Sequence, residues 1–343
     1  MSDLGGSYSN DTGDFSVAVA EQPDPSRDLR SKPVVVTGAS GLVGAHVCAE
    51  LARGGWKIRA VVRDTQKAAV RLGHLPLELR VGDIRNGESM RAALNGAGAL
   101  VHLAAIAIEK TGESYEASNS DGTKVLLDSA RAEGVERLVY MSQNGSDSKS
   151  PFPFLRSKGI AQDAVTSSGL KWTVLRPSVI FGPEDEFINV LGRLVRLSPL
   201  VFPLPGGGVA RFQPVAVDDV ARAVAKVLGD DQTIGKSYSL GGPTPLSLRQ
   251  MTERILIAMK TSRVLVGIPV SALRPIVGLA GSLLPNPPVT TGLLDLLAID
   301  NVIPANDLQD ALGIEPTPFA PEELLYLRKI TAGSAIKSLF RRH

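Results

Sequence analysis

Three glycines spaced three residues apart form the clearest candidate for a chemical site. Gly38, Gly41 and Gly44 follow the valine-rich run "PVVVT" and precede a stretch with helical periodicity. Gly38 would make a tight turn, Gly41 would let backbone N–H groups approach a diphosphate, and Gly44 would let the helix pack on the strand. The alternative is a turn that only closes a βαβ unit. The loop predicts dinucleotide binding by Gly38, Ser40, Gly41, Leu42, Val43 and Gly44.

The residues after the second expected strand bear on which dinucleotide binds. An acidic residue there accepts from the ribose 2′-hydroxyl of NAD, whereas a cation pairs with the 2′-phosphate of NADP. The chain has Arg63 at this position and Lys67 one helical turn later, with Asp64 as a helix cap. We therefore favour NADP(H) over NAD(H), with a solvated arginine as the alternative. Asp83 and Ile84 would meet the adenine or serve only in a turn.

These residues require a sheet to position them, and the chain supplies its pattern. Apolar runs alternate with helical stretches from residue 32 onward, which is typical of α/β folds. The predicted fold class is α/β, a Rossmann-type doubly wound parallel sheet with a smaller mixed α/β C-terminal lobe of the substrate-binding type. Strands are expected at 33–37, 57–62, 77–83, 99–105, 136–142 and 171–177, and helices at 42–53, 119–133, about 154–167 and 247–259.

The composition along the chain suggests a division into parts. Residues 1–31 are predicted to be a flexible leader, 32–180 the dinucleotide-binding domain, 181–330 a lobe interwoven with it, and 331–343 a basic tail. In the lobe, a Gly/Pro loop, a short strand and a helix are expected within 203–224, with Asp218 or Asp219 as the helix cap.

Bulk composition excludes several classes of function. The 343 residues carry a net charge of +2, too weak a field to recruit nucleic acid. The single cysteine, Cys48, excludes an internal disulfide and is expected to be a core thiol. The four histidines have no metal-ligand spacing. The leader lacks the features of a secretory or transit peptide, so a cytoplasmic location is expected.

One apolar segment raises the question of a membrane. Residues 264–284 contain one charge in 21 residues, a length that would permit a span. Arg274 near the centre and the helix breakers Pro269 and Pro275 argue against one. We expect burial against the sheet domain, with docking onto a membrane surface or a partner as the alternative.

The ordered motifs "TGASGLVG", "GDI", "HLAA", "NSDGT" and "RPSVIFGPED" resemble the short-chain dehydrogenase/reductase superfamily. More narrowly, the chain is similar to the atypical branch that contains the NADPH-holding accessory subunit of respiratory complex I and its bacterial relatives. Photosystem-assembly factors of the same group are a competing match. The resemblance spans about residues 33–302. It implies further cofactor contacts from "HLAA" and from the segment after strand six, namely Leu103, Ala104, Ala105, Pro177, Ser178 and Val179.

The resemblance also implies a catalytic pair that this chain has only in part. Catalytic members use Tyr-x-x-x-Lys with an assisting hydroxyl, the lysine contacting the nicotinamide ribose and lowering the tyrosine pKa. Here Lys158 matches, but Phe154 stands at the tyrosine position. The assisting position falls on Ser142 or Asn144. A surface lysine is the alternative for Lys158.

Other side chains near this position could be considered as acids. Tyr140 is expected to pack in its strand, Tyr115 stays open as an alternative phenol, and His102 is expected to bond to backbone.

Two main functions follow from this pattern, and a membrane-surface adaptor that uses residues 264–343 is a third. The first is an NAD(P)H-binding protein with little or no catalysis that acts as a structural, assembly or sensing subunit of a larger, possibly membrane respiratory, complex. It would sit in the cytoplasm, or at the inner face of a membrane through that complex. The second is an NADP-dependent reductase, dehydrogenase or nucleotide-sugar epimerase that uses a different acid. A protein partner would bind the C-terminal lobe.

Overall fold

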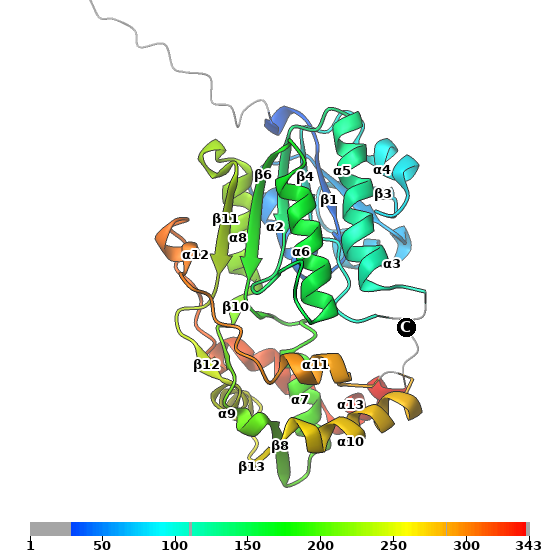
Figure 1. The fold of residues 1–343 in the computed structure, drawn as a ribbon. Helices are drawn as coiled ribbons and strands as arrows, with labels where there is room; N and C mark the ends of the chain where they lie inside the picture. Colours follow the sequence, from blue (N-terminus) through cyan, green and yellow to red (C-terminus); the bar gives the residue numbers. More distant parts are fainter. Residues whose placement is uncertain (1–28, 110–111, 286, 341–343) are drawn as a thin grey trace, which may run out of the picture.

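Valine-rich segments pair into one parallel sheet in the computed structural model, which describes residues 29–109, 112–285 and 287–340. Within these residues the main sheet has seven strands in the order β11-β6-β5-β4-β1-β2-β3 (Figure 1). The strands are β1 (Val34–Thr37), β2 (Ile58–Val62), β3 (Leu77–Val81), β4 (Ala99–His102), β5 (Arg137–Met141), β6 (Lys171–Pro177) and β11 (Lys236–Leu240).

Helices cover both faces of this sheet because the buried strands are apolar on both sides. Val34 and Val36 of β1 face one core, and Val35 between them faces the other. The first core is closed by α2 (Leu42–Arg53), α3 (Thr65–Leu72) and α8 (Val217–Leu228). The second is closed by α4 (Gly87–Leu94), α5 (Gly122–Ala132) and α6 (Pro153–Thr166).

A smaller lobe with its own apolar core lies below the carboxyl ends of the strands in Figure 1. Its strands are β7 (Ile180–Phe181), β8 (Val201–Pro205), β9 (Arg211–Phe212), β10 (Val215–Ala216), β12 (Leu246–Ser247) and β13 (Val264–Ile268). Its helices are α7 (Ile188–Leu197), α9 (Leu248–Ala258), α10 (Val270–Leu283), α11 (Thr291–Leu296) and α13 (Ala332–Leu339); α12 (Asp307–Asp310) contacts β11 of the main sheet. Short 3₁₀ segments are Gly206–Gly208, Asp231–Thr233 and Pro321–Lys329.

The predicted fold class is confirmed, and the chain crosses between its two parts. After β10 the chain returns to the sheet, where α8 packs on α2 and β11 pairs with β6. The β11 strand was not among the predicted strands. The predicted domain boundaries stay a prediction, and residues 1–28 of the expected leader and 341–343 of the expected tail lie outside the described residues.

Several predicted element ends are wrong by a few residues. β3 ends at Val81 and β4 at His102, earlier than predicted, because the chain leaves the sheet at the carboxyl ends of these strands. The helix predicted at 119–133 begins as a π-helical turn, Glu116–Asp121, before α5.

Two further expectations about the lobe are wrong. Asp218 and Asp219 lie in the first turn of α8, whose N-cap is Ala216. Asp219 instead accepts hydrogen bonds from the backbone and hydroxyl of Thr317. The segment 264–284 is not buried against the sheet domain: it forms β13 and α10, and no residue of α10 is buried.

Candidate functional site

The glycine loop has the geometry that its sequence predicts. Gly38 has a φ of +72°, and a Cβ there would lie 2.7 Å from the backbone nitrogen of Ala104. A Cβ on Gly44 would lie 2.2 Å from the Gly38 carbonyl oxygen. At Gly41 the tightest contact would be 3.2 Å. Gly38 and Gly44 are thus required by the fold, whereas Gly41 keeps an exposed surface of the loop free of a side chain.

The N-terminus of α2 is built to receive an anion. Gly41 is its N-cap, no side chain caps the first turn, and no acidic residue lies in that turn. The backbone N–H groups that begin with Leu42 and Val43 therefore point from the helix end together with the positive end of its dipole. A cradle without Cβ atoms next to an uncapped helix fits a dinucleotide diphosphate.

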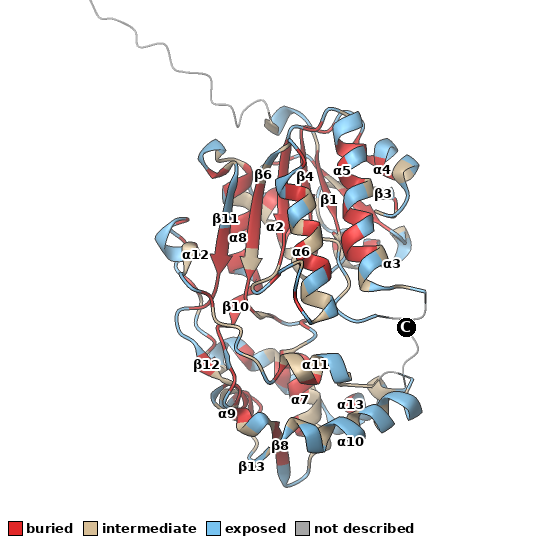
Figure 2. Cartoon of the chain, in the orientation of Figure 1, coloured by how far each residue is buried: buried red, intermediate tan, exposed pale blue. Residues whose placement is uncertain are grey.

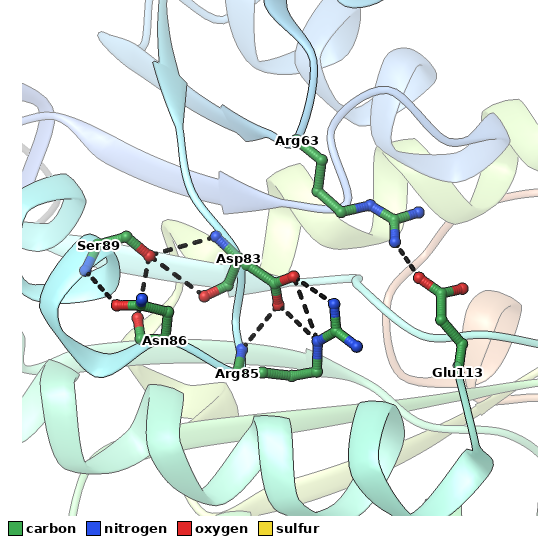
Figure 3. A network of polar contacts seen from close by, with 6 residues as sticks. All are labelled: Arg63, Asp83, Arg85, Asn86, Ser89 and Glu113. Carbon is green, nitrogen blue, oxygen red and sulfur yellow. Dashed lines mark hydrogen bonds and ion pairs between the residues drawn. The ribbon is translucent and has the colours of Figure 1, made fainter.

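Arg63 directly follows β2, at the position expected for a ribose or phosphate contact. Its guanidinium forms an ion pair with Glu113, which comes from the segment after β4 (Figure 3). The Arg63 side chain is 66% exposed, so it is accessible to a ligand. Lys67 is more exposed, and its backbone N–H donates to Asp64, which caps α3 as predicted. The lysine amine lies 3.7 Å from the Asp64 carboxylate.

Asp83 and Ile84 lie near this end of the sheet but each has a partner within the protein. The Asp83 carboxylate accepts from the guanidinium and backbone of Arg85, and the hydrogen bond from this guanidinium lowers the Asp83 pKa (Figure 3). The Ser89 hydroxyl donates to the Asp83 carbonyl. Ile84 packs against Gly122, where a Cβ would meet its side chain at 3.0 Å. Within the protein, Asp83 and Ile84 therefore stabilise a turn, which was the alternative to adenine contact.

Arg71 reaches the glycine loop, and the sequence analysis missed it. Arg71, in the last turn of α3, donates to the Ser40 carbonyl at 3.1 Å and forms an ion pair with Glu184. Glu184 follows β7, so the pair joins the sheet domain to the segment that enters the lobe. No motif marks Arg71; only the turn of α3 brings it to the loop. Its cation could hold a phosphate there. Arg59, in contrast, pairs with Glu78.

Lys158 is buried under the carboxyl end of β5. Its amine donates to the Met141 carbonyl at 2.6 Å and lies 4.6 Å from the centroid of the Tyr140 ring. Burial lowers the pKa of Lys158 to about 7, so the neutral amine is accessible near neutral pH. This geometry differs from the surface lysine that was the alternative. Tyr140 is buried in its strand as predicted, and burial raises its phenol pKa.

His102 fixes the start of the segment that faces the glycine loop. The Thr123 hydroxyl donates to the Asn119 carbonyl at 2.6 Å, so it accepts from Nε2 of His102. Nδ1 therefore accepts from the Thr37 hydroxyl at 2.8 Å. Burial lowers the His102 pKa to about 3. The partners are hydroxyl groups rather than the expected backbone, and this imidazole positions β4 beside β1.

The position of the missing phenol is filled by an aromatic contact. Phe154, at the start of α6, is half-buried, and its ring centroid lies 5.7 Å from that of Tyr115. The Tyr115 hydroxyl donates to the Ala107 carbonyl at 2.9 Å. Burial, then the nearby Glu109 carboxylate, raises the pKa of Tyr115. The Tyr115 phenol is thus hydrogen-bonded to a backbone carbonyl and held protonated.

Of the two candidates for an assisting polar group, only Asn144 is engaged by side chains or carbonyls of other described residues. The Ser142 hydroxyl is buried and has no hydrogen-bond partner in the part of the chain that the structure describes. The Asn144 amide donates to the Asn301 side chain at 2.8 Å and to the Val302 carbonyl. Asn144 therefore ties the loop after β5 to a segment far along the sequence.

The segment after β6 is held by hydrogen bonds to residues far along the sequence. The Pro177 carbonyl accepts from the Asn144 backbone, and the Ser178 hydroxyl donates to the Asn301 carbonyl at 2.7 Å. The Val179 carbonyl accepts from the Val215 backbone. The turn that follows is closed by Asp185, whose buried carboxylate accepts from the Tyr326 hydroxyl; burial raises the Asp185 pKa.

The "HLAA" segment runs directly beside the glycine loop. The Leu103 N–H donates to the Thr37 carbonyl at 3.2 Å, which continues the pairing of β4 with β1. Ala104 then packs against Gly38, and Ala105 follows. The structure thus brings together the glycine loop, "HLAA", Lys158 and Pro177–Val179 at the carboxyl edge of the sheet. Whether each touches a cofactor stays a prediction.

Comparison with known proteins identifies the family to which this chain belongs. Residues 38–231 match the family model described as NAD(P)H-binding. The chain belongs to this NAD(P)H-binding family. Its residues are 30% identical over 227 positions to the mitochondrial NADH dehydrogenase [ubiquinone] 1 alpha subcomplex subunit 9 of Arabidopsis thaliana, covering 64% of this chain and 56% of that protein. The Mus musculus protein of the same name is 28% identical, with 86% and 79% covered.

Solved structures agree on the fold of this NAD(P)H-binding protein. The structure of gox2253 superposes with a TM-score of 0.69 at 23% identity and covers 91% of this chain and all of that one. The predicted kinship with the atypical dehydrogenase/reductase branch and the alpha subcomplex subunit 9 proteins is confirmed. Binding of a nicotinamide nucleotide is confirmed at the level of NAD(P)H.

The described residues offer neither a membrane-spanning helix nor a metal-binding cluster. No helix among them has the length and apolarity to cross a bilayer. No group of three or more His, Cys, Asp or Glu side chains among them could bind a metal. Cys48 is buried, and burial raises its pKa to about 12, as expected of a core thiol.

Proposed function

We propose that this protein binds NADP(H) as a structural, assembly or sensing subunit of a larger complex and performs little or no chemistry on a substrate. The observation that carries the proposal is Phe154 at the phenol position beside a complete diphosphate cradle. Phenylalanine has no proton to exchange, and general acid–base catalysis contributes about 10²–10⁴-fold to such reactions. Bound cofactor would stabilise the fold through linkage without any turnover.

Two features support the finer parts of this proposal. Arg63 and Arg71 place two guanidinium groups near the end of the loop where a 2′-phosphate would lie, which favours NADP(H) over NAD(H). Kinship with respiratory-chain subunits supports a protein partner, which would contact the C-terminal lobe. We place the protein in the cytoplasm, held at the inner face of a membrane by that complex.

The first experiment identifies the nucleotide and tests for turnover. Purified protein is denatured, and the released nucleotide is identified by mass spectrometry; we expect NADP⁺ or NADPH. The intact protein is then mixed with NADPH and a panel of aldehydes, ketones and quinones. We expect no oxidation of NADPH above the blank rate. Turnover by the unmodified protein would overturn the non-catalytic role, and release of NAD⁺ alone would overturn the cofactor preference.

A second candidate function is a reductase or epimerase that uses another acid. The contact between Tyr115 and Phe154 favours it, because a phenol lies close to the expected position. The engaged hydroxyl and raised pKa of Tyr115 argue against it. In the same assay, Tyr115→Phe should abolish turnover if this candidate is right. Phe154→Tyr should create activity only if the remaining site still accepts a substrate.

A further inference from the structure

The helix α10 is apolar on the side that faces the protein and also on the side that faces away. Val270, Leu273 and Val277, at helical spacing, are half-buried and face the lobe. On the other side Ile276, Leu279 and Leu283 are 64%, 61% and 71% exposed. An exposed helix on a soluble lobe normally presents polar residues outward, and one that is apolar all round is normally covered.

The exposed apolar surface continues from α10 into the strand before it. β13 reaches α10 through Pro269, and Val264 and Val266 alternate outward, with exposures of 63% and 39%. In the paired strand β8, Val201 lies opposite Val264 and is 48% exposed. Figure 1 places β8, β13 and α10 at the end of the lobe remote from the main sheet, and Figure 2 shows α10 without a buried residue.

Charge around this surface is basic. Between Glu253 and Asp295 the sequence has no acidic residue but contains Arg254, Lys260, Arg263 and Arg274. Lys260 is exposed beside the start of β13 and forms no ion pair with any described residue. The exposed Arg274 lies on α10 itself and pairs with Asp295. Arg254 and Arg263 are half-buried and donate to the Phe319 and Ser198 carbonyls, so Lys260 is the exposed base of this stretch that no described acid neutralises. An apolar helix with such a base at its border is complementary to a bilayer surface that contains anionic lipids.

The length and interruptions of the segment set how it can meet a bilayer. α10 has 14 residues, and Pro275 lies inside it. At a rise of about 1.5 Å per residue the helix is too short to cross a hydrocarbon core of about 30 Å. The outward side chains can enter only the boundary between headgroups and acyl chains, so the helix would lie along the surface.

We propose that the surface formed by Val201, Val264, Val266, Ile276, Leu279 and Leu283 docks this protein onto an anionic bilayer. The outward side chains enter the interface, and Lys260 contacts lipid phosphates. The docking requires neither the cofactor nor a partner complex, so it is independent of the proposed function. It would hold the carboxyl edge of the main sheet away from the membrane, because the two lie at opposite sides of the lobe.

Co-sedimentation with vesicles tests this proposal on the full chain. Vesicles of phosphatidylcholine mixed with phosphatidylglycerol should carry the protein into the pellet, and vesicles of phosphatidylcholine alone should carry much less. Leu279→Ser together with Leu283→Ser should weaken binding by about ten-fold or more for each residue that enters the interface. Lys260→Gln should weaken binding to the mixed vesicles more than to the neutral ones.

A matched variant and two further measurements make the outcome decisive. Val70→Ser together with Val81→Ser removes two apolar side chains of 89% and 65% exposure from the sheet domain and should leave sedimentation unchanged. Thermal unfolding and NADPH titration should be the same for both double variants, which separates docking from cofactor binding. Failure of the unmodified chain to sediment with mixed vesicles would overturn the proposal. So would sedimentation that Leu279→Ser/Leu283→Ser does not reduce, or a dimer in light scattering that this variant converts to monomer.

Discussion

The Lys158 amine lies 2.6 Å from the Met141 carbonyl oxygen and directly over the Tyr140 ring. In the related enzymes that the sequence resembles, the matching lysine serves both the ribose and a tyrosine. Here the tyrosine is absent and the lysine is anchored to the end of β5. A lysine retained in this form supports a site kept for binding rather than for proton transfer.

Lys158 should make the stability of the protein depend on pH in the alkaline range. Burial lowers its pKa from 10.5 to about 7, so between these values the unfolded chain carries one proton more than the folded chain. The free energy of unfolding should therefore rise with pH across this window, by at most about 1.4 kcal/mol per pH unit. Urea unfolding of the unmodified protein and of Lys158→Met across this window checks it. Equal slopes for the two proteins would refute the assignment.

His102 should contribute a pH dependence of the same sign in the acidic range. Burial lowers its pKa from 6.5 to about 3, so between these values the unfolded chain binds the extra proton. Stability should fall as pH decreases from 6.5, again by at most about 1.4 kcal/mol per pH unit. His102→Gln can still bond between the two threonines and should show a shallower loss in urea unfolding. A variant as acid-sensitive as the parent would contradict this role.

Substitutions of the loop glycines should distinguish a residue needed for folding from one needed for NADPH binding. Gly44→Ala forces a Cβ to 2.2 Å from a backbone oxygen, so the variant should lose several kcal/mol of stability or fail to fold. Gly41→Ala meets its neighbour at 3.2 Å and should keep the fold while weakening NADPH binding. Thermal unfolding and NADPH fluorescence titration measure both.

Gly278→Ala is the control for the glycine series. A Cβ at this position of α10 has open space, so the variant should bind NADPH as the parent does and be at least as stable, by up to about 1 kcal/mol, because alanine favours the helix. If Gly41→Ala bound NADPH as tightly as the parent, the diphosphate would not lie against the loop at this residue.

Arg71 and Glu184 should set the preference for the phosphorylated nucleotide. Arg71→Leu removes a cation beside Ser40 and should weaken NADPH binding by about ten-fold while affecting NADH less. Glu184→Gln removes the carboxylate that engages Arg71 and should strengthen NADPH binding. Isothermal titration with both nucleotides measures the ratio. Arg91→Leu, an exposed arginine of α4, is the matched control, and equal losses for NADPH and NADH in Arg71→Leu would exclude a role in selectivity.

Features that depend on neighbours along the chain could be predicted from the amino-acid sequence. The glycine spacing, the helix cap at Asp64 and the valine-rich strand β1 are local patterns whose physical consequences are short-range, so the loop and most of the sheet could be predicted. Phe154 in place of a tyrosine was equally visible, because it stands at a fixed distance from Lys158.

Contacts between residues far apart in the chain became known only from the folded structure. Arg71 reaches Ser40 across 31 positions, Asn144 meets Asn301 across 157, and β11 joins a sheet whose other strands end at Pro177. The apolar run 264–284 predicted burial because apolar side chains favour leaving water. Hydrophobicity does not say whether another part of the protein covers the segment. Packing left the outer side of α10 uncovered, since the lobe's own core is already filled from other helices.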